Sequence, residues 1–325
     1  MMAGLTWLHL SDWHQKGEDF DCDVVRETLI KDIKTRTHIH KDLKKIDFIV
    51  FSGDVTFNGK KAAYDAAVKY LFTPLLEVTG LDASRLFLVP GNHDLDRQIA
   101  TLFREQILKC FTSDEIIKEC LSKKAEQEIL SKPFEAYENF AKPYAEGNLS
   151  AYASYYSFTV GDKKIALLGF NSALLSGRGD TDYGNLFIGE YQVSKPLEKA
   201  KAEADVRIAV LHHPLEYLTA EDQSTMESRL KKGVHFILHG HPHKGSVTIQ
   251  RIPVGDCMIV PAGATYHRHI DANPNYISSY NFMHLDFETG NGQAYLRKWD
   301  ETSGCWTKHI RDIHPEGIFA FPIPK

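Results

Sequence analysis

Residues 46–94 read IDFIVFSGDVTFNGKKAAYDAAVKYLFTPLLEVTGLDASRLFLVPGNHD, and this stretch decides the fold. The short apolar runs at 46–51 and 85–89 predict two buried strands. The longer segment 60–78 between them alternates apolar and polar residues at helical spacing and predicts a helix, disturbed at Pro74 because proline lacks a backbone N–H. Two strands joined by a helix are typical of a parallel strand pair.

The flanking sequence extends this unit into a larger α/β arrangement. A strand at 6–10 and a helix at 22–44 come first, so the order strand–helix–strand–helix–strand predicts a layered α/β core with parallel pairing. Residues 98–145 have a helical pattern and no strand signal, and we expect a helical insert within a single domain of residues 1–325. The other expected elements are a hairpin (155–160 and 165–171), helices (189–204 and 221–232) and strands (206–211, 234–238, 246–252, 257–262, 280–287, 293–299 and 305–310).

Composition excludes several classes of protein. The chain has 325 residues, of which 43% are hydrophobic and 25% charged, as in ordinary globular proteins and unlike disordered or fibrous chains. With 38 basic and 43 acidic residues the net charge is −5, so the protein does not bind nucleic acid through its overall charge. Any contact with nucleic acid would have to involve a local basic patch. Five cysteines without a C-x-x-C pair fit a reducing cytosol, and we expect a cytoplasmic protein. We see no signal peptide and no apolar run of about 20 residues, so no membrane partner is expected.

Polar residues of the types that bind metals follow five of the expected strands. Ligands bind at the carboxyl ends of strands in α/β sheets, so these clusters could converge on one place. Carboxylate, amide oxygen and imidazole together suit Mn, Fe or Zn, and a shared carboxylate can hold two ions about 3.5–4 Å apart for an in-line phosphoryl displacement. The clusters are Asp12-Trp13-His14, Ser52-Gly53-Asp54, Gly91-Asn92-His93-Asp94, His212-His213-Pro214 and His239-Gly240-His241-Pro242-His243.

These clusters resemble the calcineurin-like metallophosphoesterase family. The family pattern is D-x-H, GD, GNH(D/E), H-x-P and GHxH, and this sequence has DWH, GD, GNHD, HHP and GHPH over roughly residues 5–290. The resemblance implies a four-layer α/β/β/α sandwich of two mixed sheets with a dinuclear metal centre between them. It also implies a phosphoester hydrolase in which a metal-bound hydroxide attacks phosphorus.

The resemblance also assigns roles to individual residues. Asp54 would bridge the two ions, and His93 would act near the leaving-group oxygen as general acid or charge stabiliser. Asp94 would orient His93, as carboxylates do for imidazoles at metal sites. The implied ligands are Asp12, His14, Asp54 and His243 for the first ion, and Asp54, Asn92, His212 and His241 for the second.

Several histidines have two interpretations. The family spacing favours His212 over His213 as ligand, and adjacent residues of a strand point to opposite faces. We interpret His239 as structural. The pair His267 and His269 follows an expected strand, and either forms part of a loop or reaches the rim of the site. His38 and His40 lie in a locally basic stretch that we interpret as a solvated helix end, with a nucleic-acid role as the alternative.

Departures from the family pattern reduce the number of candidate activities. Phe57 stands where purple acid phosphatases have tyrosine, and GDVTFNGK lacks the arginine of the Ser/Thr protein phosphatases. SDWHQKG resembles DNA-repair nucleases, whereas GDVTFNGKKAAY and LVPGNHD resemble cyclic-nucleotide phosphodiesterases. We therefore expect a phosphodiesterase acting on a nucleotide-like diester, with a DNA nuclease or a phosphomonoesterase as alternatives. A non-enzymatic scaffold is disfavoured because no ligand is missing.

Two segments bear on access and partners. The insert 98–145 follows the GNHD loop and either caps the metal centre or serves in packing or dimerisation. The apolar tail PEGIFAFPIPK (315–325) either pairs with a sheet edge or docks on a partner. The protein therefore either works alone or forms a homodimer or a complex with another protein.

Overall fold

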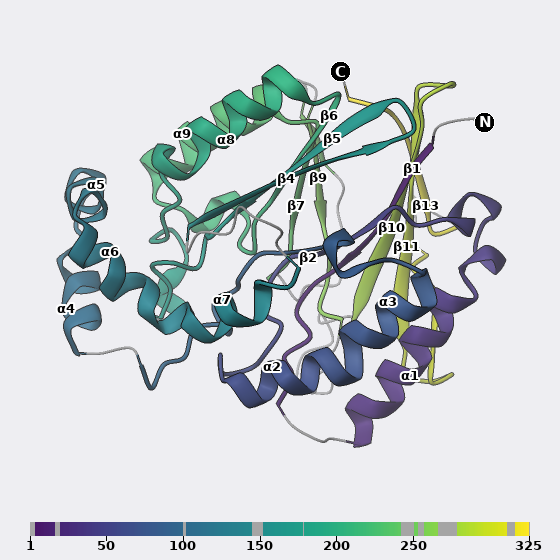
Figure 1. Ribbon diagram of the computed structural model, residues 1–325, viewed down its shortest axis with the longest axis horizontal. Coiled ribbons are helices and arrows are strands. Elements are labelled where there is room, and N and C mark those ends of the chain that lie inside the picture. The colour runs from purple at the N-terminus through teal and green to yellow at the C-terminus, as the bar shows by residue number, and fades with distance from the viewer. Residues whose placement is uncertain are drawn as a thin grey trace.

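Two β-sheets face each other in the centre of the molecule, and helices cover the outer face of each sheet (Figure 1). This arrangement is seen in a computed structural model. It describes residues 4–16, 20–99, 102–144, 152–177, 179–241, 250–252, 257–265, 278–310 and 316–324. Both sheets are mixed, so the expected α/β/β/α sandwich is confirmed.

The first sheet has the strand order β12-β11-β10-β1-β2-β3, with β13 paired to β11. Neighbours β1, β2 and β3 run parallel, as the helical connections between them predict, and β10 is antiparallel to β1. The strands are β1 (Gly4–Leu10), β2 (Phe48–Phe51), β3 (Leu86–Leu88), β10 (Ser279–Asp286), β11 (Asn291–Asp300), β12 (Cys305–Lys308) and β13 (Ile318–Pro322). The helices on its outer face are α1 (Phe20–Lys34), α2 (Lys61–Ala67) and α3 (Thr73–Thr79).

The second sheet has the order β4-β5-β6-β7-β9-β8. Its first two strands form the expected antiparallel hairpin, and β5, β6, β7 and β9 pair in parallel. Its strands are β4 (Ala153–Val160), β5 (Lys163–Phe170), β6 (Val206–Val210), β7 (Phe236–His239), β8 (Gln250–Ile252) and β9 (Cys257–Pro261). Helices α8 (Glu190–Glu203) and α9 (Ala220–Gly233) cover its outer face at the upper left of Figure 1.

Two helices differ in detail from the sequence-based prediction. The helix expected over 22–44 ends at Lys34 and is followed by short 3₁₀ turns, so its predicted end was wrong. The reason is Arg36, whose guanidinium donates to the carbonyls of Ile33 and Leu43 and fixes a turn there. The disturbance expected at Pro74 is confirmed: a π-helical turn, Val68–Phe72, separates α2 from α3.

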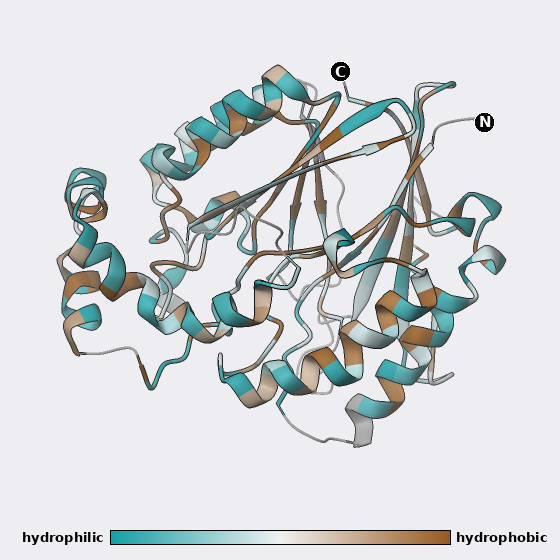
Figure 2. Ribbon diagram, in the orientation of Figure 1, coloured by the Kyte–Doolittle hydropathy of each residue, from teal (hydrophilic) through white to brown (hydrophobic). Residues whose placement is uncertain are grey.

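The hydrophobic core has one layer between the sheets and one outside each of them. Between the sheets, the Trp7 ring stacks on Phe48 at 5.5 Å and meets Phe236 of the second sheet edge-on at 5.4 Å. The outer helices turn their apolar sides toward the sheets and their polar sides outward (Figure 2). This packing holds the two sheets in a fixed relation, which sets the distance between their strand ends.

The insert and the tail both pack onto the chain itself. The insert contains α4 (Leu102–Cys110), α5 (Asp114–Ser122), α6 (Lys124–Ser131) and α7 (Glu135–Ala141). The buried apolar residues of α4, α5 and α6 share a cluster with 173–175, whereas those of α7 pack into the core on the outer face of the first sheet. Buried Arg104 donates to the carbonyls of Leu174 and Ser176 at 2.8 and 2.9 Å. The tail forms β13, antiparallel to Asn291–Tyr295 of β11, and so pairs with a strand of the chain's own sheet. In the ranges given above, no helix combines the length and apolarity that crossing a membrane requires.

Candidate metal centre

Strand ends from the two sheets bring one group of donor atoms together. The Nε2 atom of His212, just after β6, lies 3.2 Å from Asn92 Oδ1, 3.3 Å from Asp54 Oδ2 and 3.3 Å from His241 Nδ1. Donor atoms that bind one ion at about 2.0–2.1 Å lie roughly 2.9–3.4 Å apart in tetrahedral or octahedral geometry. The three distances measured from His212 Nε2 therefore match the spacing of ligands on one ion.

A second group of donors adjoins the first and shares Asp54 with it. The Nε2 atom of His14 lies 3.7 Å from Asp12 Oδ1 and 3.9 Å from Asp54 Oδ2. Ligand atoms of His14, Asp54 and His93 lie within 4.8 Å of one another, and so do those of Asp12, Asp54 and His212. One buried carboxylate thus belongs to both groups, which is the arrangement that a bridging ligand requires.

The backbone is strained at four of these donors. Asp12, His14, Asp54 and His241 have φ angles of 55°, 52°, 55° and 69°, and no other non-glycine residue with positive φ occurs in the ranges that the structure describes. Such conformations cost energy and persist where the surroundings enforce them, which is frequent at functional sites. Here the loops hold one another: His14 N donates to Asp54 O at 3.0 Å, and His241 N donates to Asp12 Oδ2 at 3.0 Å.

Two glycines give the carboxylates the space that they occupy. A Cβ atom on Gly91 would lie 2.1 Å from Asp54 Oδ1. A Cβ atom on Gly240 would lie 2.5 Å from Asp12 Oδ2. Both distances are far below ordinary contact, so any larger residue would displace a carboxylate of the centre. The glycines of the GNHD and GHPH motifs are thus explained by close approach of the backbone to acidic side chains and, at Gly240, also to the hydroxyl of Ser11.

The electrostatics of the centre favour a cation. Burial alone raises the pKa of Asp54, but the facing imidazole of His212, with His93 and His14, outweighs burial and holds that pKa well below its usual range. Burial lowers the pKa of His212, but the carboxylates of Asp54 and Asp12 outweigh it and raise the pKa to about 9. The carboxylates therefore stabilise positive charge between them, which is the requirement for holding divalent ions.

His93 lies at the edge of the donor group and is held by two hydrogen bonds. Its backbone N–H donates to Asp54 Oδ1 at 2.8 Å, and its Nδ1 atom lies 3.0 Å from the carbonyl oxygen of Phe57. A carbonyl oxygen only accepts hydrogen bonds, so Nδ1 carries a hydrogen and donates it, and the Nε2 atom is the one that can exchange a proton or stabilise charge. The half-buried ring is placed for that role beside His14, at a centroid distance of 4.8 Å.

Asp94 does not orient His93, and that expectation was wrong. Its buried carboxylate accepts hydrogen bonds from the backbone N–H groups of Gly91, Val55 and Thr56 at 3.0, 3.2 and 3.1 Å, and from the Tyr64 hydroxyl at 3.0 Å. Burial and the nearby Asp54 charge raise the pKa of Asp94 to about 6 despite these donors. The physical reason is that each group has other partners. Backbone amides of two loops donate to the Asp94 carboxylate, and the His93 ring bonds to the backbone carbonyl of Phe57 instead. Asp94 therefore ties the GD loop to the GNHD loop.

The structure separates the two adjacent histidines after β6. His212 Nε2 lies next to Asp54 and Asn92, while the Nδ1 atom of buried His213 lies 3.1 Å from Ser172 Oγ. The His213 ring is nevertheless 4.5 Å from that of His241, and ligand atoms of His212, His213 and His241 fall within 4.8 Å of one another. His213 is therefore an inner neighbour of the centre that the spacing argument alone did not reveal.

Other histidines lie apart or outside the described ranges. His239 is buried, with Nδ1 3.0 Å from the Gly240 carbonyl, as expected of a structural residue. His40 lies 2.9 Å from the Tyr295 hydroxyl, and neither it nor His38 is near the donors named above. The expected ligand His243 and the pair at 267 and 269 fall outside the described residues.

Sequence reasoning missed three side chains around the centre. Buried His9 points to Ser52 Oγ at 3.0 Å, and burial together with the nearby His239 lowers its pKa to about 3. Phe57 stacks on the His93 ring, and Tyr217 meets the His241 ring edge-on at 4.6 Å. Only Phe57 had a sequence signal, its place three residues after Asp54.

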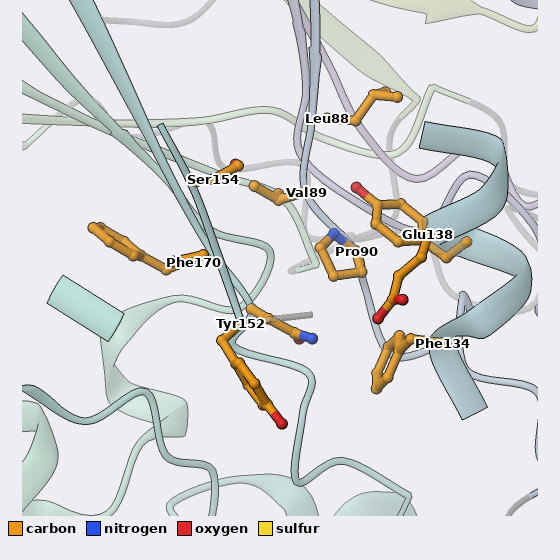
Figure 3. Close-up of a pocket in the computed structure, with 12 residues that line it drawn as sticks. Leu88, Val89, Pro90, Phe134, Glu138, Tyr152, Ser154 and Phe170 are labelled. Carbon is orange, nitrogen blue, oxygen red and sulfur yellow. The ribbon is translucent and has the colours of Figure 1, made fainter. Parts of the chain in front are cut away.

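A small cavity lies beside this region but is distinct from it (Figure 3). It is lined by Pro90, Phe134, Glu138, Tyr152 and Ser154, between the end of β3, the insert and the second sheet. Its volume of about 20 Å³ has room for about one water molecule, so it is too small for a substrate.

Comparison with known proteins shows the family to which the chain belongs. The model of the calcineurin-like phosphoesterase family matches residues 5–245, so the chain belongs to this family of metallophosphoesterases. The uncharacterized metallophosphoesterase-like protein YydB of Bacillus subtilis (strain 168) is 24% identical over 313 residues. That match covers 93% of this chain but 61% of YydB, so the chain spans less than two thirds of that relative.

Two further similarities concern a shorter match and a solved structure. A probable cyclic nucleotide phosphodiesterase of Ruthia magnifica subsp. Calyptogena magnifica is 27% identical over 97 residues, which is 28% of this chain and 38% of that protein. The crystal structure of a novel phosphatase from Mycoplasma pneumoniae has a TM-score of 0.48 at 12% identity. It covers 94% of this chain and 97% of that one.

Proposed function

We propose that this protein is a phosphodiesterase that hydrolyses a nucleotide-like diester with two metal ions. The observation that carries the proposal is the pair of adjoining donor groups that share the buried carboxylate of Asp54. Four strained backbone positions at the donors support it, because such strain is retained where function requires it.

The donor chemistry fits Mn, Fe or Zn, and the protein's own residues would hold the ions and the substrate in place. Bound ions would supply a hydroxide nucleophile and neutralise the phosphoryl oxygens. The ligands would be Asp12, His14, Asp54, Asn92, His212 and His241 with, by the family pattern, His243. His93 would hold or move a proton at Nε2, next to the leaving-group oxygen, and Asp94 would keep the two loops in register.

Diester specificity is the finer part of the proposal. It is supported by the contexts of the GD and GNHD motifs, which resemble phosphodiesterases, and by the partial match to a protein named as a probable cyclic nucleotide phosphodiesterase. We also propose a reducing, cytosolic setting, because Cys110, Cys120, Cys257 and Cys305 are free thiols.

The test compares an aryl phosphodiester with the matching monoester, with Mn²⁺ and after chelation. The variants Asn92→Ala and His241→Ala each remove one donor, and we expect each to lose hydrolysis by at least ~100-fold because a ligand is missing. The matched controls are Asn139→Ala and His38→Ala, which change the same residue types at exposed positions far from the donors. Metal content measured by mass spectrometry gives a readout that is independent of turnover.

The outcomes separate the alternatives. Mn²⁺-dependent cleavage of the diester, lost in both donor variants but not in the controls, supports the proposal. Preference for the monoester would make the protein a phosphatase, and cleavage of an oligonucleotide with salt-sensitive binding would make it a nuclease. Full activity in either donor variant, or a wild-type protein that takes up no metal, would refute the metal centre.

A further inference from the structure

The loop that follows Asp54 is held firmly although its tip is exposed. Gln15 links the first two motif loops, since its N–H donates to the Val55 carbonyl at 3.0 Å and its carbonyl accepts from the Phe57 N–H at 3.2 Å. The Phe57 carbonyl in turn holds His93 Nδ1 at 3.0 Å. The backbone of Phe57 is thus fixed on both sides, and its position relative to the donor groups is well determined.

The ring of Phe57 is an exposed aromatic surface beside the metal centre. Its side chain is 43% exposed, and its centroid is 5.0 Å from that of His93 at an angle of 27°. The centroid of the His14 ring lies 6.4 Å from that of Phe57, with the two rings edge to face at 68°. A single exposed apolar residue is ordinary on a protein surface. Direct contact with two residues of the centre is the feature that gives this one a role.

A positive charge lies over the same ring. The ammonium of exposed Lys16 is 3.9 Å from the centroid of Phe57, which shows that the ring can accept a partner there. Lys16 is also two residues after His14, and its ammonium lies over a ring that stacks on His93, at the edge of the donor groups. An aromatic ring and a cation next to a phosphoryl site match the two parts of a nucleotide, its base and its phosphate.

We infer that Phe57 is the platform on which the nucleobase of the substrate stacks, and that it sets a preference for nucleotide esters over plain alkyl or sugar phosphates. This inference rests on the proposed function and names the substrate class of that same site. The base takes the place of the Lys16 ammonium over the ring, and the freed ammonium stays within reach of the phosphate.

Magnitudes favour the base over the ammonium. An exposed cation–π contact strengthens association by about 2–5-fold, whereas stacking of a base on an aromatic side chain contributes about 5–150-fold. The fixed backbone of Phe57 adds to this difference, because little conformational freedom is lost when the base binds. A ligand with a base should therefore bind more tightly than the same ligand without one.

The experiment compares two ligands that differ only by the base, adenosine 5′-monophosphate and ribose 5-phosphate. Both are measured as competitive inhibitors of Mn²⁺-dependent hydrolysis of methyl 4-nitrophenyl phosphate, and by calorimetry with the Mn²⁺-loaded protein. The variants are Phe57→Leu, which removes the aromatic face, and Phe57→Tyr, which keeps it. Phe103→Leu is the matched control, since Phe103 is a 75% exposed phenylalanine on the insert.

We expect wild type, Phe57→Tyr and Phe103→Leu to bind the nucleotide 5–150-fold more tightly than the sugar phosphate, and Phe57→Leu to bring this ratio close to one. A purely structural role of Phe57 in supporting His93 would weaken both ligands alike and leave the ratio unchanged. A wild-type ratio near one, or a ratio that survives in Phe57→Leu, would overturn the inference. Failure of the proposed function has a different signature, the absence of Mn²⁺-dependent hydrolysis, and calorimetry would then still report the ratio.

Discussion

Replacement of Gly91 by alanine tests how closely the backbone must approach the bridging carboxylate. The added Cβ would lie 2.1 Å from Asp54 Oδ1 and 2.6 Å from the Asp54 backbone nitrogen. Ordinary contact begins at 3.4 Å, so the carboxylate would have to move by about 1.3 Å and the Asp54 backbone by about 0.8 Å. The hydrogen bond from His93 N to Asp54 Oδ1 would be broken by the same movement.

The expected consequence is a loss of metal and of activity with the fold retained. Metal–ligand distances tolerate about ±0.2 Å, so a shift of about 1.3 Å in a ligand shared by two ions should remove bound metal from both. A misplacement of about 1 Å typically costs on the order of 100-fold in rate, and overpacking costs about 1–3 kcal/mol in the free energy of unfolding. We therefore expect Gly91→Ala to lose at least ~100-fold in kcat/KM.

The assay measures metal content, diester hydrolysis and urea unfolding on the same preparations. Gly80→Ala is the control: Gly80 has a φ of 70° with nothing within 4 Å of its added Cβ, so it should lose about 1–2 kcal/mol of stability through backbone strain alone. Equal destabilisation with metal and activity lost only in Gly91→Ala would support the reasoning. A Gly91→Ala protein with two bound ions and normal kcat/KM would refute it.

Two further predictions concern stability away from the donors. Arg104→Met should lower the free energy of unfolding by about 1.5–3 kcal/mol and speed hydrogen exchange in residues 171–177, because two buried carbonyls lose a charged donor. Lys118→Met, which removes one side of an exposed ion pair, is the control and should leave the free energy of unfolding close to the wild-type value. Equal losses of stability in the two variants would contradict the expectation. Burial raises the pKa of Asp222 from 3.8 to about 6, although the N–H groups of residues 188 and 189 oppose the rise. Because the pKa of this carboxyl is higher in the folded than in the unfolded protein, the wild type loses stability as the pH rises from about 4 through 6. Asp222→Asn lacks this titration, so its free energy of unfolding should rise relative to that of the wild type by up to about 3 kcal/mol over the same range. Urea unfolding of both proteins at pH 4.5 and 7.5 measures this, and an equal difference between them at the two pH values would contradict the prediction.

Much of the fold followed from local patterns. Apolar runs and helical periodicity predicted the parallel order of β1, β2 and β3 and the hairpin of β4 and β5, because a buried strand and an amphipathic helix have their own sequence periods. The disturbance at Pro74 was also predictable, since a missing N–H acts within one turn. The end of α1 was not, because Arg36 stops it by contacts with carbonyls that include one at Val78, distant in sequence.

The partner of the C-terminal tail was likewise not predictable from the sequence. Its apolar character indicated that 315–325 packs on something, and the structure pairs Ile318–Pro322 with β11 of the same chain. Neither hydrophobicity nor length could distinguish a self-contact from a partner, because an exposed sheet edge offers the same hydrogen-bonding groups to both.

The sequence by itself determined the donor types and their places after strand ends, because a strand's carboxyl end is a local property of the chain. Tertiary structure alone decided how the donors meet: the place of Asp54 in both donor groups, the left-handed backbone at Asp12 and the position of His212 next to Asp54. It also decided that Asp94 joins two loops and that Phe57 holds His93. These features are contacts between segments brought together only when two sheets pack face to face, and no local pattern encodes that distance.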